Sequence, residues 1–564
     1  MPAPTTTLFY APDGYDTGRQ RLMGRHAAGE GMLKGLIRHA GFDHLVAMTP
    51  SAADGQAFEA QCRALGATMP LASIREAELP RVAETGSLLL PGPDIANHAW
   101  RRRRIGEANA FSLIGITHTI ASTGAMDAIA GALTAPVQPW DALICTSSAV
   151  QGAVRRLLAM EGEWLRDRLG ATRIEGPALP VIPLGVDAPA LAPDPAARAE
   201  WRQKLGIGTR DIAVLHHGRL SFHAKAHPLP MFLGLARAAG AAPAGAKVVL
   251  ILSGWFADDT QRRAFTELAR ALSPRLAIRL VERPETGTTL RAAADIFTLL
   301  SDNIQESFGL APVEALAAGL PVVGTDWDGL KDTVDHGVTG FRIPTLMAGP
   351  QGDLADRHDT GADSYDSYIA GVAQFTAVDV GAAEAAFRAL IGDPDLRARM
   401  AAAALHTARA RFDWSAVMAQ YRALWADLAA IRGGATGERA RPRPGGPRLP
   451  RRPDPVALFA DYPTRRLAPE TRLCFAPGIA TPAEALARLR ILAAIPGAAA
   501  RRELLPGEES FAAALAVLET GPATAAAMAA NLPPPVPPAR AARLHRGLAW
   551  LVKMDILRLE AGPA

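Results

Sequence analysis

Two glutamates, Glu306 and Glu314, stand eight positions apart in the segment SDNIQESFGLAPVEALAAG, residues 301–319. The apolar run at residues 295–300 is typical of a buried strand. Residues 310–318 are helix formers with a proline near the first turn and a glycine directly after them, which predicts a helix. Glu306 then lies in the loop before this helix and Glu314 lies inside it. Both carboxylates can accept hydrogen bonds from paired sugar hydroxyls.

The junction between this strand and this helix also offers backbone donors. The N–H groups of Phe308, Gly309 and Leu310 are expected to point into the crevice beyond the strand end, with the positive end of the helix dipole behind them. An anionic or hydroxyl-rich ligand such as a sugar nucleotide fits this place. The alternative is two solvated glutamates near a helix start, where acidic residues are common.

Several ordered motifs resemble one known family. ESFGLAPVEALAAGLPVVGTD, followed by GLKDTV and HGVTGF, resembles the donor-binding half of family 4 retaining glycosyltransferases of GT-B fold. HHGRLSFHAK is similar to the GRLxxxK element of that family, with five residues between Arg219 and Lys225, one more than the pattern. LPVIPLGVD resembles its VIPNGVD segment, with Leu184 in place of Asn, and FDW at residues 412–414 resembles the start of its closing helix. The resemblance spans about residues 8–431.

The resemblance implies roles for individual residues. Arg219 and Lys225 would supply cations to the donor diphosphate, Glu306 would hold the donor sugar, and Glu314 would hold the ribose hydroxyls. The donor-binding set is completed by Gly218, Ser307, Phe308, Gly309 and Leu310. We assign no general base, because the leaving phosphate of a retaining enzyme can itself take the acceptor proton.

The first half of the chain contributes three further candidates. His118 follows the strand pattern SLIGITHT at residues 112–119, and the resembled family often has a histidine at such a strand end near the donor sugar. The usual His-Asp pair is absent because Thr119 follows, and a structural histidine is the alternative. Gly29 and Gly31 belong to GRHAAGEG, which we expect to form a glycine-rich cleft loop before a helix at residues 32–39; a flexible turn is the alternative.

Alternating strand and helix patterns predict an α/β protein with two Rossmann-like, doubly wound domains of GT-B type, plus a small, mainly α domain at the C-terminal end. We expect an acceptor-side domain at residues 1–195 and a donor-binding domain at 196–411. A closing helix at 412–432 would pack back on the first domain. Residues 433–455 are rich in Pro, Gly and Arg and predict a linker. Residues 456–564 form a helical module in which a helical bundle is the simpler expectation, and WLVKMDIL is the one winged-helix-like element.

Composition and charge indicate the class of protein and its cellular compartment. Of 564 residues, 49% are hydrophobic and 21% charged, as in an ordinary globular protein, and the net charge of +4 gives no indication of nucleic-acid binding. Three scattered cysteines predict neither a disulfide framework nor a metal site. No leader-like start and no long apolar run are present, so we expect a cytoplasmic protein, soluble or peripheral at the inner membrane face. The run RRRR at residues 101–104 predicts a solvated helix face or, alternatively, a contact with an anionic membrane or phosphate-bearing acceptor.

The sequence therefore predicts a glycosyltransferase that uses a UDP- or GDP-sugar and a glycan, lipid-linked or other hydroxyl acceptor, in bacterial surface polysaccharide assembly. No cofactor or metal is expected, although Asp326-Trp327-Asp328 superficially matches a metal-binding DxD motif. The expected partners are the donor and the acceptor, without nucleic acid, and a protein that binds the C-terminal module. The alternatives are a sugar-nucleotide epimerase, a phosphorylase for which we find no pyridoxal lysine motif, and a catalytically inactive sugar-nucleotide-binding or scaffold protein.

Overall fold

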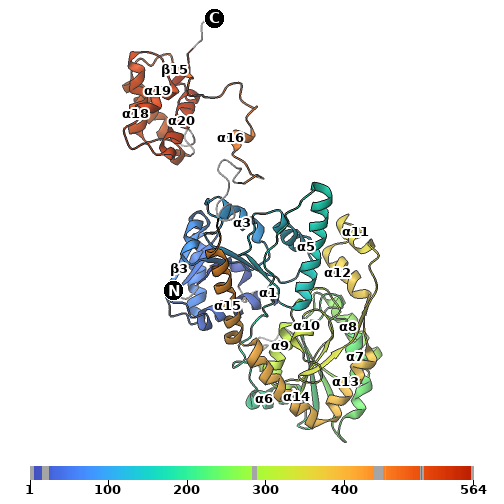
Figure 1. The fold of residues 1–564 in the computed structure, drawn as a ribbon. Helices are drawn as coiled ribbons and strands as arrows, with labels where there is room; N and C mark the ends of the chain where they lie inside the picture. The colour runs from blue at the N-terminus through green and yellow to red at the C-terminus, as the bar shows by residue number, and fades with distance from the viewer. Residues whose placement is uncertain are drawn as a thin grey trace. The chain divides into compact units, whose positions relative to one another are not determined.

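The computed structural model describes residues 5–15, 24–282, 289–436, 449–450, 452–495, 497 and 501–560. The chain divides into two compact units, Met1–Arg451 and Arg452–Ala564, labelled by element in Figure 1. The first unit contains two parallel β-sheets with helices packed on them. Most of the linker expected at 433–455 lies outside the described residues.

The first sheet has six parallel strands in the order β3-β2-β1-β4-β5-β6. Its order places the strand crossover next to β1, where open α/β sheets bind ligands. The strands are β1 (Thr7–Phe9), β2 (Leu45–Thr49), β3 (Leu71–Arg75), β4 (Ser87–Leu89), β5 (Ser112–Ile116) and β6 (Ala142–Ile144). The connecting helices are α1 (Gly24–His39), α2 (Ala52–Ala64), α3 (Ile95–Arg103), α4 (Thr123–Ala130) and α5 (Ser148–Leu169).

The second sheet repeats this topology in the order β12-β11-β10-β7-β8-β9, again all parallel. The predicted pair of Rossmann-like domains is thus confirmed. The strands are β7 (Ile212–Arg219), β8 (Val248–Trp255), β9 (Ala277–Glu282), β10 (Ile296–Leu299), β11 (Val322–Thr325) and β12 (Gly340–Ile343). Helix α6 (Pro195–Leu205) precedes these strands, and the helices after β7 include α7 (Leu229–Ala238), α8 (Asp259–Leu272), α9 (Leu310–Ala317), α10 (Leu330–Thr333), α13 (Val380–Gly392) and α14 (Pro394–Thr407).

Helix α15 (Trp414–Gly433) returns to the first sheet after the second is complete. Its apolar side chains share one core with α1 and strands of the first sheet, and Figure 1 shows α15 among the blue elements of that domain. Trp414 is buried at its start. A Cβ on Gly185 would lie only 2.3 Å from the Trp414 ring, so the chain passes too close to the indole for a side chain there.

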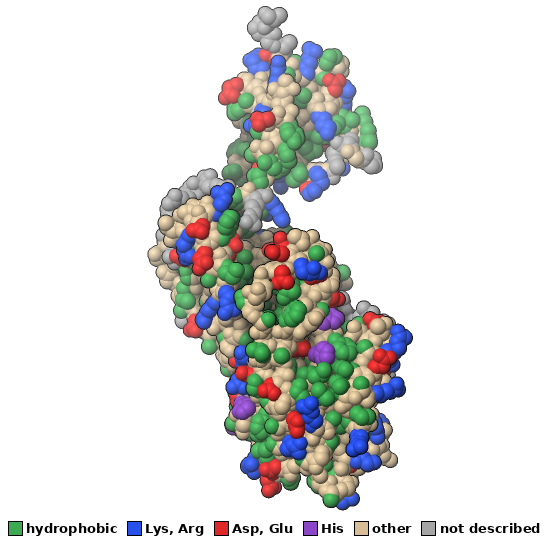
Figure 2. Space-filling view, turned by 90° about the vertical axis from the view of Figure 1, so that its right-hand side faces the viewer, with side chains coloured by type: hydrophobic (Ala, Val, Ile, Leu, Met, Phe, Trp, Pro, Cys, Tyr) green, Lys and Arg blue, Asp and Glu red, His purple; other side chains and the backbone are tan. Residues whose placement is uncertain are grey.

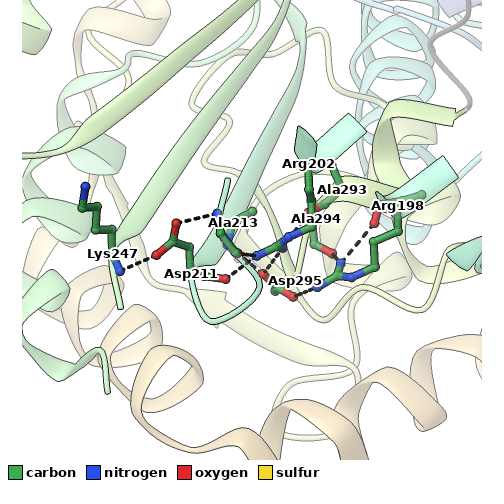
Figure 3. Close-up of polar contacts among 10 residues, drawn as sticks. Arg198, Arg202, Asp211, Ala213, Lys247, Ala293, Ala294 and Asp295 are labelled. Carbon is green, nitrogen blue, oxygen red and sulfur yellow. Dashed lines mark hydrogen bonds and ion pairs between the residues drawn. The ribbon is translucent and has the colours of Figure 1, made fainter. Parts of the chain in front are cut away.

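A polar network joins the N-terminal ends of β7 and β10, the strands that lead to Arg219 and to the 301–309 loop (Figure 3). The Asp295 carboxylate accepts hydrogen bonds from Arg198 Nη2 (2.6 Å), Arg202 Nη1 (3.2 Å) and the Ala213 N–H (2.7 Å). Arg202 Nη2 also donates to the Asp211 carbonyl at 2.6 Å. Polar side chains therefore hold β7 and β10 together, in addition to the backbone hydrogen bonds between the two strands.

The arginine run at residues 101–104 is not a uniformly solvated helix face, and this corrects the expectation. Arg102 is buried and forms a two-fold ion pair with the buried Asp141, with N–O distances of 2.6 and 2.7 Å. Arg102 points into the domain toward Asp141, which also accepts a hydrogen bond from the Leu113 N–H. The pair thereby ties α3 to the sheet. Arg101 is exposed and pairs with Glu76.

Between β12 and α13 the second domain carries an added hairpin. Strands β13 (Thr345–Met347) and β14 (Thr376–Val378) pair antiparallel, with α11 (Asp353–Asp359) and α12 (Tyr365–Gln374) between them. His358 stacks on Tyr368 with ring centroids 4.6 Å apart. Leu346 and Phe375 of this hairpin are largely exposed.

The second unit is mainly α, as predicted, but it is not a pure helical bundle. It contains a three-stranded antiparallel sheet in the order β16-β15-β17. Its elements are α16 (Pro455–Leu458), β15 (Arg472–Phe475), α17 (Pro482–Ala494), α18 (Glu508–Ala516), β16 (Ala523–Thr524), α19 (Ala525–Ala530), α20 (Pro538–Lys553) and β17 (Leu557–Leu559). The segment WLVKMDIL forms the end of α20 and leads into β17. Its residues Ile556 and Leu557 are buried in the core of the unit. Helices α19 and α20 lie between β16 and β17, and both of these strands pair with β15 rather than with each other.

Figure 2 shows basic and acidic side chains interspersed over the visible face of the first unit. This mixture agrees with the small net charge of the chain. Within the described residues, no helix combines the length and apolar character that crossing a membrane requires.

Candidate active site

The carboxyl end of β7 delivers Gly218 and Arg219. This strand pairs with β8 up to Arg219 and Trp255. Gly218 has a φ of +151°, and a Cβ there would lie 2.9 Å from Lys225 Cε. Glycine is therefore required for the Lys225 side chain to fold back over the strand end.

Lys225 and Glu306 form an ion pair at the centre of this site, with 2.6 Å between Lys225 Nζ and Glu306 Oε2. Only 16% and 11% of the two side chains are exposed. The Lys225 backbone is held as well, because its carbonyl accepts hydrogen bonds from Ser301 Oγ and Asn303 Nδ2. The extra residue in the GRLxxxK-like element does not prevent the lysine from reaching Glu306.

Arg219 lies beside this pair. Its Nη2 donates to the Ala224 carbonyl at 3.0 Å and approaches Gln305 Oε1 at 3.5 Å. The described residues contain no carboxylate within ion-pair distance of Arg219. Its charge is consequently available to an anionic ligand.

Residues 307–310 form the turn into α9. Gly309 is the N-cap residue, with a φ of +89° and without a side-chain cap, so the first N–H groups of α9 are not taken by a capping side chain. The Phe308 side chain is buried and packs against Phe412, with ring centroids 6.0 Å apart. Only the backbone of Phe308 can therefore serve a ligand in this arrangement.

Glu314 lies in α9 and forms an ion pair with Arg291. Arg291 comes from the 3-10 turn η5 (Thr289–Ala293) and is almost completely buried, whereas Glu314 is partly exposed. Sequence reasoning missed Arg291. Its signal was an arginine within the apolar stretch TLRAAADIF, where a charge must find a buried partner.

Two neighbouring histidines on β7 were also missed. His216 Nδ1 lies 3.2 Å from the Thr298 carbonyl, and His217 Nδ1 lies 3.0 Å from Ser253 Oγ. Burial lowers the pKa of His216 to about 4 and that of His217 to about 3, with a further contribution from the positive charge of Arg291 to the shift of His217. Both rings are therefore neutral near pH 7.

Residues 326–328 do not gather two carboxylates around one point. Asp326 faces Arg342, with 3.5 Å between Oδ1 and Nη1, whereas Asp328 lies beside Glu306 and burial raises its pKa to about 8. Trp327 donates its indole N–H to the Asn303 carbonyl at 2.7 Å. In the described part of the chain, no group of three or more His, Cys, Asp or Glu side chains is arranged to hold a metal ion.

The first domain meets this site through the N-terminus of α5. Ser147 Oγ donates to the Ser307 carbonyl at 2.8 Å. The Ser148 N–H and Oγ both donate to the carboxylate of Asp332 on α10, at 2.5 and 2.6 Å. Ser307 is therefore also a contact between the two domains, and sequence reasoning missed the other three residues.

The remaining candidates lie in the first domain. His118 follows β5 by two residues at the carboxyl end of the first sheet. Gly29 and Gly31 lie inside α1, which begins at Gly24, so they do not form the expected cleft loop. A Cβ on Gly29 would meet the Gly14 carbonyl oxygen at 2.1 Å, and one on Gly31 would lie 3.1 Å from Trp414. These glycines permit close packing of α1.

Two Rossmann-like domains, with Arg219, Lys225 and Glu306 at strand ends of the second and Glu314 in the helix that follows, define a chain of GT-B fold. Residues 197–347 match the sequence model of the family "Glycosyl transferases group 1". All four of these residues lie within the matched segment.

Curated relatives share part of the chain. It is 32% identical over 195 residues to D-inositol 3-phosphate glycosyltransferase of Nocardia farcinica, covering 33% of this chain and 41% of the relative. It is 31% identical over 272 residues to the enzyme of the same name from Salinispora arenicola, covering 44% and 57%. The chain thus spans about half the length of these relatives. Among solved structures, Anabaena HepE with UDP and glucose aligns with a TM-score of 0.49 at 18% identity, covering 75% of this chain and 100% of that one.

Proposed function

We propose that this protein is a retaining glycosyltransferase of family 4 that moves a sugar from a nucleotide-diphosphate sugar to a hydroxyl acceptor. The observation that carries the proposal is the convergence of two cations, a paired glutamate and an uncapped helix start. Arg219 and Lys225 come from β7 and the loop after it, and Glu306 comes from the loop after β10. Together with the start of α9, they form one site at adjacent strand ends.

The two cations stabilise the negative charge that develops during the reaction. Breaking the glycosidic bond leaves negative charge on the β-phosphate, and fixed positive groups lower the energy of that transition state. Arg219 can hold phosphate oxygens in a two-pronged geometry, and Lys225 acts as a point charge. The N–H groups at the start of α9 add donors and the positive end of a helix dipole.

The two glutamates bind neutral parts of the donor. Glu314 accepts hydrogen bonds from the ribose hydroxyls, while the ion pair with Arg291 holds its carboxylate in position. Glu306 accepts hydrogen bonds from sugar hydroxyls through the oxygen that Lys225 does not occupy. Lys225 thereby stands between the diphosphate and the sugar.

We assign the proton of the acceptor hydroxyl to the leaving phosphate, which departs on the face that the acceptor attacks. This route retains the anomeric configuration of the donor and requires no side-chain base. NMR of the product tests it: an α-linked donor is expected to give an α-linked product, and a β-linked product excludes the retaining mechanism.

The acceptor is assigned to the first domain. A sugar or lipid-linked hydroxyl in bacterial surface polysaccharide assembly is the proposed class. D-inositol 3-phosphate belongs in the acceptor panel because the curated relatives carry that substrate in their names.

Donor binding is tested by thermal shift with UDP, GDP, ADP and their common sugar conjugates, since a ligand specific for the folded state stabilises it by mass action. We expect one nucleotide series to raise the melting temperature and Glu314→Ala to abolish the increase. Glu200→Ala is the control, because Glu200 pairs only with the exposed Lys204 on α6. Wild-type protein that responds to no nucleotide would support the scaffold alternative, and conversion of the donor without acceptor would support the epimerase.

A further inference from the structure

Asp328 has a backbone conformation that an L-residue rarely adopts. Its φ is +42°, and among the described non-glycine residues only Asp555 shares a positive φ. Left-handed backbone is strained for a residue with a side chain, and aspartate tolerates it only somewhat better than most. Such outliers gather at functional sites, where the surrounding structure enforces them.

The surroundings of Asp328 enforce this conformation through the donor loop. A Cβ on Gly329 would lie 2.4 Å from Phe308 Cα and 2.5 Å from the Ser307 carbonyl oxygen, so the two loops are in direct contact. The Gly329 N–H donates to the Glu306 carbonyl at 3.3 Å. The loop that carries Asp328 is thus fastened to the residues of the proposed donor site.

The Asp328 carboxyl differs from Glu306 in its partners. Glu306 is paired with Lys225, whereas no Lys or Arg side chain in the described part of the chain lies within ion-pair distance of Asp328. Burial and, to a smaller extent, the negative charge of Glu306 raise the pKa of Asp328 to about 8, with Asp332 acting in the same direction and the Gly329 N–H and Lys331 acting against it. A protonated carboxyl can donate one hydrogen bond and accept others, which an ionised one cannot.

We propose that Asp328 recognises the donor sugar together with Glu306, and that the two carboxyl groups select an uncharged, hydroxyl-rich sugar. This inference rests on the proposed function. Glu306 accepts from sugar hydroxyls, and Asp328 donates to a sugar oxygen. A uronic acid is expected to bind more weakly, because its carboxylate would lie beside the Glu306 carboxylate, and Lys225 is already paired with Glu306.

Asp328→Gly tests this inference, because glycine adopts the positive φ without strain while removing the carboxyl. The nucleotide is whichever of UDP or GDP stabilises the wild-type protein, and the conjugates are UDP-glucose and UDP-glucuronate, or GDP-mannose. We expect the variant to bind the free nucleotide within about twofold of wild type and the neutral sugar nucleotide about 10- to 100-fold more weakly. Asp555→Gly removes the other positive-φ aspartate, in the second unit, and is expected to change neither affinity.

Asp328→Asn separates recognition from a merely structural role. Asparagine keeps a neutral donor and acceptor and tolerates positive φ. Wild-type affinity for the sugar nucleotide is expected to fall as the pH rises through about 8, because the Asp328 carboxyl then loses its proton. Asp328→Asn is expected to remove that decline while keeping the affinity at pH 7.

Two results would overturn the inference. Asp328→Gly that discriminates sugar nucleotide from free nucleotide as wild type does would make Asp328 a structural residue. Wild-type preference for UDP-glucuronate over UDP-glucose would refute the selection of an uncharged sugar. Failure of the proposed function itself looks different, since the wild-type protein would then bind neither nucleotide.

Discussion

At the scale of single residues, the site consists of charges held by partners from distant parts of the chain. Lys225 meets Glu306, and Arg291 meets Glu314. In each pair the cation contacts one carboxylate oxygen, and the other oxygen can accept a hydrogen bond from a hydroxyl. The pairs therefore hold the acidic groups in place before a donor arrives, which lowers the entropy lost on binding.

Arg291→Met tests whether the arginine orients Glu314. Methionine keeps an unbranched apolar side chain but removes the cation that pairs with Glu314, the carboxylate proposed to bind the ribose. We expect the dissociation constant for the free nucleotide to rise about tenfold by calorimetry, the loss of about one charge-assisted hydrogen bond. An unchanged dissociation constant would show that Glu314 needs no partner.

The sequence was sufficient for part of this site. Arg219, Lys225, Glu306 and Glu314 stand in recognisable local motifs, and the structure places the first three together. Arg291 and Asp328 could not be found in that way, because their roles follow from contacts with residues far along the chain and from a backbone angle. Gly29 and Gly31 misled because a glycine in a helix can serve close packing as well as loop flexibility.

At the scale of elements, buried polar links align the strands that deliver site residues. Asp295 ties β7 and β10 at their N-terminal ends, and Arg102–Asp141 ties α3 to the first sheet. The fold class followed from strand and helix patterns because each parallel strand is a short apolar run. The burial of Arg102 did not follow, because a run of four arginines looks alike whether or not one of them turns inward.

Replacing Arg102 with Met should strongly destabilise the first domain. Asp141 would then remain buried without its cation, a defect that typically costs about 3–5 kcal/mol. Urea unfolding measures the loss, with Arg101→Met as the matched control. Arg101 forms an exposed pair with Glu76, so its replacement should cost less than about 1 kcal/mol. Equal effects of the two substitutions would contradict the structural role of the buried pair.

At the scale of the whole molecule, two sheets of the same topology face one site, and a helix from the end of the first unit joins the core of the first sheet. Ser147 and Ser148 at the start of α5 contact Ser307 and Asp332 of the second domain. These hydrogen bonds join the two domains next to the loop that carries Glu306. The second unit has its own core of helices and sheet.

Asp332→Ala should loosen this connection between the domains without removing a donor contact. The variant loses both hydrogen bonds from Ser148. We expect kcat to fall about tenfold while the dissociation constant for the free nucleotide stays within about twofold of wild type, because closure completes the site rather than the nucleotide contacts. A kcat that stays at the wild-type value in Asp332→Ala would contradict this prediction. The exposed Asp259→Ala is the control.

The most direct test of the account is the rate at which Arg219→Ala releases nucleoside diphosphate from the sugar nucleotide that stabilises the wild-type protein, at saturating donor. Arg219 has no carboxylate partner among the described residues, and it is proposed to meet charge that grows only as the glycosidic bond breaks. We predict that the wild-type protein releases nucleoside diphosphate and that the release rate of Arg219→Ala is at least about 100-fold lower. The affinity for the donor should change far less. Equal release rates in the two proteins would contradict the assignment of this site to sugar transfer.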